Sequence, residues 1–121
     1  MLNYLLEWRE KLMTRKLDDT NFEGFIKDSF YSAVGFYSPS VENQDKMIEV
    51  IEQFSKTHGS VSCGIMDITG QNIPDEYGIG EDEIPIVVVF KQGNPFKAVT
   101  DISIENIANA ITPPGKNITL Q

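Results

Sequence analysis

The chain has 121 residues, of which 40% are hydrophobic and 23% are charged, so it suits one compact domain with a hydrophobic core and intrinsic disorder is not expected. Its net charge of −8 at pH 7 repels nucleic-acid phosphates and anionic lipid, which excludes both as expected partners. One cysteine, Cys63, excludes an internal disulfide and a multi-cysteine metal site, so we expect a cytoplasmic location and no cofactor or metal.

The first elements are a helix, a short strand and a second helix. Apolar residues recur at helical spacing over residues 2–12 and predict an amphipathic N-terminal helix, which passes into a short strand near residues 13–17. Thr20 and Glu23 have the spacing of a capping box, in which each side chain bonds a backbone amide near the other. A helix of about ten residues is therefore predicted after Thr20.

The middle of the chain reads as strand, helix, strand. Residues 31–37 predict a strand, and Ser38-Pro39-Ser40 is typical of a helix start. The helix that follows should end at His58-Gly59, because Gly is the usual residue past a helix end. Residues 61–68 predict the next strand.

The last third predicts a hairpin between two short helical segments. Residues 72–78 read as a short helix or turn, and the apolar run over residues 84–90 reads as a strand opened by a proline. A turn over residues 92–95 would pair this strand with residues 97–100. Apolar spacing over residues 104–111 predicts a final helix, which Ser103 is placed to cap.

This order, β-α-β-α-β-α-β-β-α, predicts an α/β domain with helices on both faces of one sheet. The last two strands form a hairpin, so the sheet should be mixed. We expect residues 1–111 to form this single domain, with residues 1–12 as an additional N-terminal helix. Residues 112–121 are expected to be a loose C-terminal tail.

Two groups of residues resemble thioredoxin, and the resemblance spans about residues 12–111. Val34-Gly35-Phe36-Tyr37 resembles the central strand of that family. Tyr77-Gly78-Ile79, then Ile84-Pro85, then Val89-Phe90-Lys91-Gln92-Gly93 resemble its cis-proline strand and hairpin. The resemblance implies a thioredoxin-like three-layer sandwich, in which a mixed central sheet lies between two layers of helices, and the Ile84–Pro85 bond is a candidate cis peptide.

Four parts of the redox site of thioredoxin are missing: its two cysteines, a buried Asp and a Lys. That family places Trp-Cys-Gly-Pro-Cys-Lys after the central strand, where this chain has residues 38–46 without sulfur. Gly35 stands where the family has a buried Asp, and the Lys that neighbours this Asp falls at about Gly64. Thiol–disulfide exchange needs an attacking thiolate and a second thiol that resolves the mixed disulfide. We therefore expect no disulfide oxidoreductase activity.

The loop before Pro85 is about two residues longer than in the family and carries three adjacent acids. In the family this loop borders the groove where partner polypeptides lie, and the residue before the proline offers its backbone to an extended peptide. The leading hypothesis is therefore an adaptor, assembly factor or chaperone-like module that binds a protein or peptide, and a basic partner suits the acids. The expected binding residues are Tyr37, Ser38, Pro39, Ser40, Val41, Glu81, Asp82, Glu83, Ile84 and Pro85.

Two other functions stay open at this point. Ser38 or Ser40 at a helix N-terminus could hold a bound thiolate, as in glutathione transferases, which would make the protein a glutathione- or thiol-binding enzyme. The domain could instead be a purely structural subunit that docks through its N-terminal helix. Cys63 lies in a predicted central strand with no basic residue beside it in sequence, so we expect a buried core residue rather than a reactive thiol.

Overall fold

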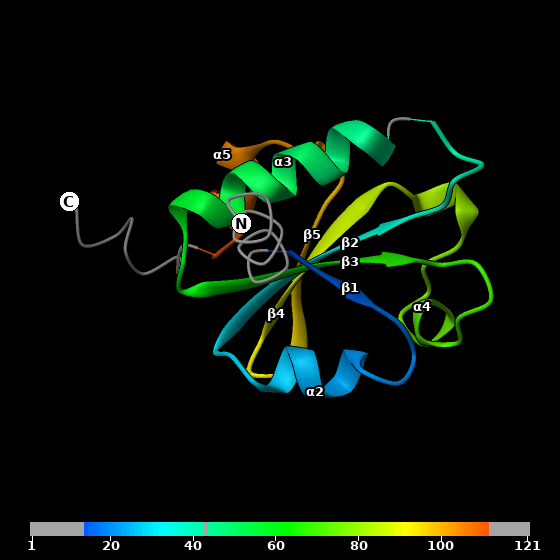
Figure 1. Cartoon of the computed structure of the whole chain (residues 1–121), viewed down its shortest axis with the longest axis horizontal. Coiled ribbons are helices and arrows are strands. Elements are labelled where there is room, and N and C mark those ends of the chain that lie inside the picture. The colour runs from blue at the N-terminus through cyan, green and yellow to red at the C-terminus, as the bar shows by residue number, and fades with distance from the viewer. Residues whose placement is uncertain (1–13, 43, 112–121) are drawn as a thin grey trace, which may run out of the picture.

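The computed structural model describes residues 14–42 and 44–111, and it contains one five-stranded sheet with helices on both faces (Figure 1). The strands are β1 (Thr14–Leu17), β2 (Tyr31–Tyr37), β3 (Val61–Asp67), β4 (Ile86–Lys91) and β5 (Asn94–Val99). The helices are α2 (Phe22–Lys27), α3 (Gln44–Thr57), α4 (Ile73–Glu76) and α5 (Ile104–Ile111), with a 3₁₀ turn, η1 (Glu81–Glu83). The helix expected over residues 1–12 and the tail expected over residues 112–121 lie outside the described residues.

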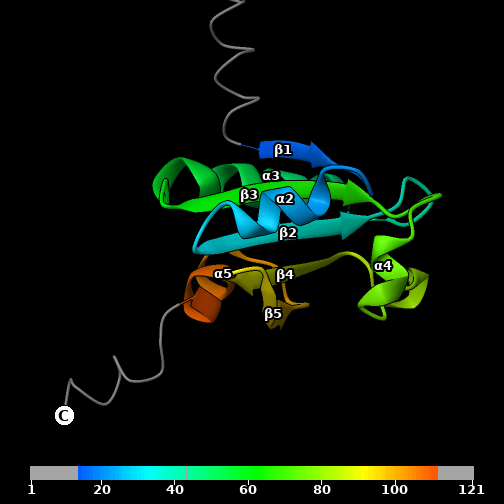
Figure 2. The ribbon, with the colours of Figure 1, turned by 90° about the horizontal axis from the view of Figure 1, so that it is seen from below.

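The sheet is mixed, as the sequence predicts, and its strand order is β1-β3-β2-β4-β5. β1 and β2 each run parallel to β3, whereas β4 runs antiparallel to both β2 and β5. α3 and α5 lie on one face, and α2 lies on the other, over β2 and β3 (Figures 1 and 2). The predicted thioredoxin-like α/β architecture is confirmed.

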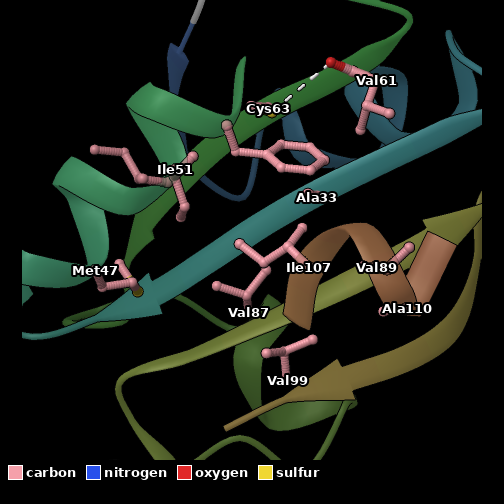
Figure 3. Close-up of a cluster of buried hydrophobic side chains, with 12 residues drawn as sticks. Ala33, Met47, Ile51, Val61, Cys63, Val87, Val89, Val99, Ile107 and Ala110 are labelled. Atoms are coloured by element: carbon pink, nitrogen blue, oxygen red, sulfur yellow. Dashed lines mark hydrogen bonds between the residues drawn. The ribbon is translucent and has the colours of Figure 1, made fainter. Parts of the chain in front are cut away.

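β4 is a strand buried on both faces. Val87 and Val89 belong to the core under α3 and α5, and Val88 and Phe90 belong to the core under α2. Successive side chains of a strand point to opposite faces, so a strand covered on both sides reads as a continuous apolar run. Figure 3 shows the first of these cores, in which Met47 of α3 faces the sheet.

Gly35, in β2, lies where α3 comes close to the sheet. A Cβ atom at this position would collide with Cδ1 of Ile51, and it would lie 2.9 Å from both Cε and Sδ of Met47. A packed core has no empty space into which these two side chains could move. The position that resembles the family's buried Asp therefore holds no room for a carboxylate.

Gly64 is not the neighbour of this position, contrary to the sequence prediction. The β2–β3 register pairs Gly35 with Ile65, and Ile65 belongs with Cys63 to the core under α3. Gly64 points to the other face, where a Cβ atom would lie 2.8 Å from Cδ1 of Leu17. The error is one residue in register, which in a strand moves a side chain to the opposite face.

α2 is shorter than predicted, and the predicted capping box does not form. The helix spans six residues, and its N-cap is Asn21, which makes no side-chain capping bond. The hydroxyl and the amide of Thr20 instead donate to Oδ1 of Asp18, over 2.5 and 2.8 Å. Short polar side chains favour such local turns, and here the turn takes the hydroxyl that the cap needs.

β4 and β5 form the predicted hairpin with a shorter turn than expected. Gln92 and Gly93 have φ values of 52° and 84°, the pair of positive φ angles that a two-residue hairpin turn requires. Asn94 and Pro95, which were expected in the turn, belong to β5 instead. A register shift between Val89 and Phe90 interrupts the ladder.

Three other elements agree closely with the sequence. β2 spans Tyr31–Tyr37 as predicted, and β3 ends one residue early at Asp67. α5 begins at Ile104, after Ser103. The amide of Asn106 donates to Oγ of Ser103 over 3.0 Å, which confirms the predicted cap.

We expect Gly35→Ala to lower the free energy of unfolding by about 1–3 kcal/mol, because its Cβ overpacks the contact with Met47 and Ile51. Gly24→Ala is the matched control in α2, since a Cβ there meets nothing within 4 Å and Ala favours a helix over Gly by about 1 kcal/mol. Urea unfolding followed by circular dichroism measures both variants. A Gly35→Ala variant as stable as the parent would contradict the close approach of α3.

Candidate functional site

The two predicted halves of the site meet where the central strands β2 and β3 end and β4 begins, at a border of the sheet that we call the Pro85 edge. β2 and β3 run parallel and end at Tyr37 and Asp67, which are partners in the register. β4 runs back along β2 with Ile86 opposite Phe36, so Pro85 lies next to the end of β2. The Ile84–Pro85 peptide bond is cis.

A shallow hollow of about 210 Å³ lies on the α3 side of this edge. It is lined by Lys46, Met47, Pro85, Thr100, Asp101 and Ile102. Sites for small molecules and cofactors usually have volumes of about 300–1,000 Å³. The hollow therefore suits a single side chain of a partner better than a cofactor.

Of the ten predicted binding residues, only Pro85 lines this hollow. Sequence reasoning missed residues 100–102, which connect β5 to α5. The sequence contains part of the information that locates these residues. The Ser103 cap places the start of α5, and the hairpin returns β5 to the end of the sheet where β4 begins. Only the pairing of β5 with β4 shows that this connection reaches Pro85.

Ile84 precedes the ladder at this edge. The residue is 7% exposed, and it belongs to the core under α2. The backbone is extended (φ −96°, ψ 153°), and the ladder between β2 and β4 begins only at Ile86. An extended backbone outside a ladder is the arrangement that strand addition uses.

Ser38 and Ser40 do not cap α3, contrary to the sequence prediction, because α3 begins at Gln44. Their hydroxyl oxygens lie 3.0 Å apart, and the Ser40 amide donates to Oγ of Ser38 over 3.3 Å. The amide of Val41 donates to the Ser38 carbonyl over 3.0 Å. The buried Ser38 side chain thus stabilises a tight turn, and neither hydroxyl has the helix-terminal position that the thiol-binding alternative needs.

The other predicted residues after β2 differ in exposure. Pro39 is exposed, whereas Val41 is half-buried against the core under α2. Tyr37 is half-buried against the core under α3. Its burial raises the pKa of the phenol, and the negative charge of Asp67 raises it further, so Tyr37 stays neutral and able to donate a hydrogen bond at neutral pH.

η1 holds the three acids in solvent beside Pro85. The amide of Gly80 donates to Oε1 of Glu83 over 2.8 Å, and the Glu83 amide donates to the Gly80 carbonyl over 3.0 Å. Glu83 therefore closes the turn, while Glu81 and Asp82 project from it as exposed carboxylates. Within residues 14–42 and 44–111, no group of three or more His, Cys, Asp or Glu is placed to hold a metal ion.

Cys63 lies in the core under α3, far from solvent (Figure 3). It is 3% exposed, and its thiol donates to the Val61 carbonyl over 3.7 Å. Burial raises the pKa of the thiol to about 12. The predicted core position is confirmed, and such a pKa leaves the thiol protonated at neutral pH.

Comparison with known proteins identifies the fold. No protein-family profile matches the sequence, and no curated relative does. A mutant thioredoxin from Halobacterium salinarum NRC-1 matches the structure with a TM-score of 0.72 and 15% identity, over 81% of this chain and 87% of that chain. A chain from a structural study of thiol resolution in yeast mitochondrial 1-Cys peroxiredoxin, via glutathione and thioredoxin systems, matches with a TM-score of 0.69 and 18% identity, over 79% of this chain and 91% of that chain. At these identities the matches show a thioredoxin-like fold.

In the described part of the chain, no helix is long and apolar enough to cross a membrane.

We expect iodoacetamide to leave Cys63 of the folded protein unmodified at about pH 8, because the buried thiol is neither ionised nor accessible. Intact-mass measurement over time follows the reaction. The same reaction in concentrated urea is the control, and there the thiol should be alkylated rapidly. Rapid alkylation of the folded protein would contradict the buried position.

Proposed function

We propose that this domain binds an extended segment of another protein at the sheet edge formed by Tyr37, Ile84 and Pro85, and that it carries out no disulfide exchange. The observation that carries the proposal is the extended Ile84 backbone, which lies outside the ladder and beside the Pro85 hollow. An added strand takes its affinity from main-chain hydrogen bonds and its specificity from pockets for alternate side chains. The edge offers both.

The Pro85 hollow supplies the specificity in this proposal. Met47 and Ile102 give it an apolar part, and Thr100 and Asp101 give it polar groups on the α5 side. A partner side chain that fills the hollow loses its contact with water at the centre of the interface, where most binding energy resides. Tyr37 does not line the hollow, but its neutral phenol is a hydrogen-bond donor at the end of β2.

The charge of the edge favours a basic partner. Glu81 and Asp82 are exposed on η1, Asp101 lines the hollow, and Lys46 is the cation among the lining residues. Surface acids of this kind raise the rate of association with a basic partner more than they raise affinity, and salt screens the effect. An adaptor, assembly factor or chaperone-like role follows from such binding.

The packing around the edge supports the absence of redox chemistry. The turn after β2 carries serines that bond one another, and the space beneath Gly35 is filled by Ile51 and Met47. The buried thiol of Cys63 has neither the low pKa nor the access that a nucleophile needs. A single thiol also has no second thiol to release it from a mixed disulfide.

We expect Thr100→Arg to weaken binding of the partner by about tenfold or more, because the long side chain fills the Pro85 hollow. Gln53→Arg, on the exposed side of α3, is the control with the same added charge and should bind as the parent does. The partner is captured from the native host with the immobilised domain, purified and titrated by calorimetry against each variant. Equal affinities of the three proteins would overturn the placement of the site.

We expect the domain to reduce insulin no faster than dithiothreitol alone, because it has no accessible thiol. Turbidity of the precipitating insulin chain follows the reaction, with a thioredoxin as the positive control. Turnover above the blank would contradict the proposal, and its loss in Cys63→Ser would assign the activity to that thiol.

A further inference from the structure

A second and larger hollow, which we call the hairpin groove, lies on the face of the sheet that α2 partly covers. It has a volume of about 400 Å³ and lies between the α4–η1 segment and the β4–β5 hairpin. Ile79 and Tyr77 line one wall, and Lys97 lies on the β5 side. Ile86, Val88 and Ala98 form its floor.

The groove exists because the helical cover on this face is incomplete. α2 spans only six residues and lies over β2 and β3, whereas β4 and β5 extend beyond it (Figure 2). Ala98 is opposite Val88 in the register, and its small side chain leaves space that a larger residue would fill. The floor is therefore apolar and open to a side chain from outside.

One wall of the groove is anionic. Glu83 lies on the α4–η1 wall, whereas Lys97 pairs with Val89 in the register and therefore directs its side chain to the face under α3 and α5. Glu76 adds a second carboxylate next to Tyr77: burial raises the pKa of the Tyr77 phenol, and the charges of Glu76 and Glu23 raise it further. The α4–η1 wall is thus the anionic side of the groove and attracts a cation.

β5 itself is poorly suited to accept an added strand. Pro95 removes an amide donor from this edge strand, Lys97 adds a charge, and a register shift interrupts its ladder. These are the features by which edge strands avoid pairing with other chains. The β5 backbone is therefore unfavourable for strand addition, which leaves the side chains of the groove as the surface for contact beside β5.

We propose that the hairpin groove binds an apolar side chain of a polypeptide and the Lys or Arg next to it, with the apolar group over Ile86 and Ala98 and the cation against Glu76 and Glu83. The polypeptide is the same one that the proposed function places at the Pro85 edge, so this inference rests on the proposed function. Pro85 lines the first hollow and Ile86 the second, because successive residues of a strand point to opposite faces. The two hollows thus share consecutive residues of the chain, and the polypeptide of the proposal would pass from one hollow to the other there.

Three capped peptides of equal length and equal flanking residues test the inference, with the cores Lys-Leu-Lys, Glu-Leu-Glu and Lys-Ala-Lys. Each is titrated into the ¹⁵N-labelled domain. We expect the Lys-Leu-Lys peptide to shift the amide signals of Ile79 and Ala98, and the shifts to weaken as salt is added. The other two peptides should leave these signals unchanged at the same concentration. Equal shifts with the Glu-Leu-Glu peptide would overturn the inference.

Two variants, one in the floor of the groove and one on the α4–η1 wall, test the inference separately, so that a folding defect in one variant does not decide the result. Ala98→Trp fills the groove, and Glu76→Lys reverses the charge of the α4–η1 wall. Each should weaken the Lys-Leu-Lys peptide by about tenfold or more. Asn109→Trp and Glu105→Lys, exposed on α5 on the other face, are the matched controls and should bind as the parent does. Unchanged affinity in both groove variants would overturn the inference.

The same spectra separate this inference from the proposed function. Shifts at Met47, Thr100 and Asp101 without shifts at Ile79 and Ala98 would leave the Pro85 site standing and overturn the groove. Shifts at Ile79 and Ala98 alone would support the groove and count against the Pro85 site. Shifts at neither set would overturn the groove for this class of peptide, and the calorimetric titration with the Thr100→Arg variant would then decide the Pro85 site.

Discussion

The antiparallel pairing of β4 with β2 is the constraint on which the rest of the structure depends. The pairing runs from Tyr31 with Lys91 to Phe36 with Ile86, and both strands are buried on both faces. It joins two parts of the chain that are far apart in sequence, and it leaves Pro85 beside the end of β2. The Pro85 edge, the acidic η1 turn and both hollows all owe their positions to this register, because a slip of one residue would turn every β4 side chain to the wrong face.

The packing that stabilises this sheet also limits its chemistry. The close contact of Met47 and Ile51 with Gly35 removes the volume that a buried carboxylate would need. The same core encloses the sulfur of Cys63. The core beside Gly35 is thus apolar at the position that resembles the family's buried Asp.

The parts of the fold that local sequence determines could be predicted, and the parts that distant contacts determine could not. The strand over residues 31–37 and the Ser103 cap depend on neighbouring residues, and both were predicted correctly. The predicted cap of α2 was wrong because Asp18 competes for the Thr20 hydroxyl. Two favourable local arrangements of this kind cannot be ranked from the sequence. Three features depend on the register between strands, which the residue pattern of a single strand does not determine. They are the face to which Gly64 points, the position of residues 100–102 at the Pro85 hollow, and the hairpin groove.

The two-residue turn at Gln92 and Gly93 has a consequence for how the chain avoids aggregation. The run from Ile86 to Phe90 is apolar, rich in β-branched residues and uncharged, the composition of segments that stack into amyloid when exposed. Its pairing with β2 closes a long loop and is slow to form, whereas the hairpin closes a loop of two residues at small entropic cost. β5 can therefore shield one side of this run early in folding, and Pro95 and Lys97 make the new outer edge a poor template for further strands. In the folded sheet the hairpin thus covers one side of this run with an edge strand that resists further pairing.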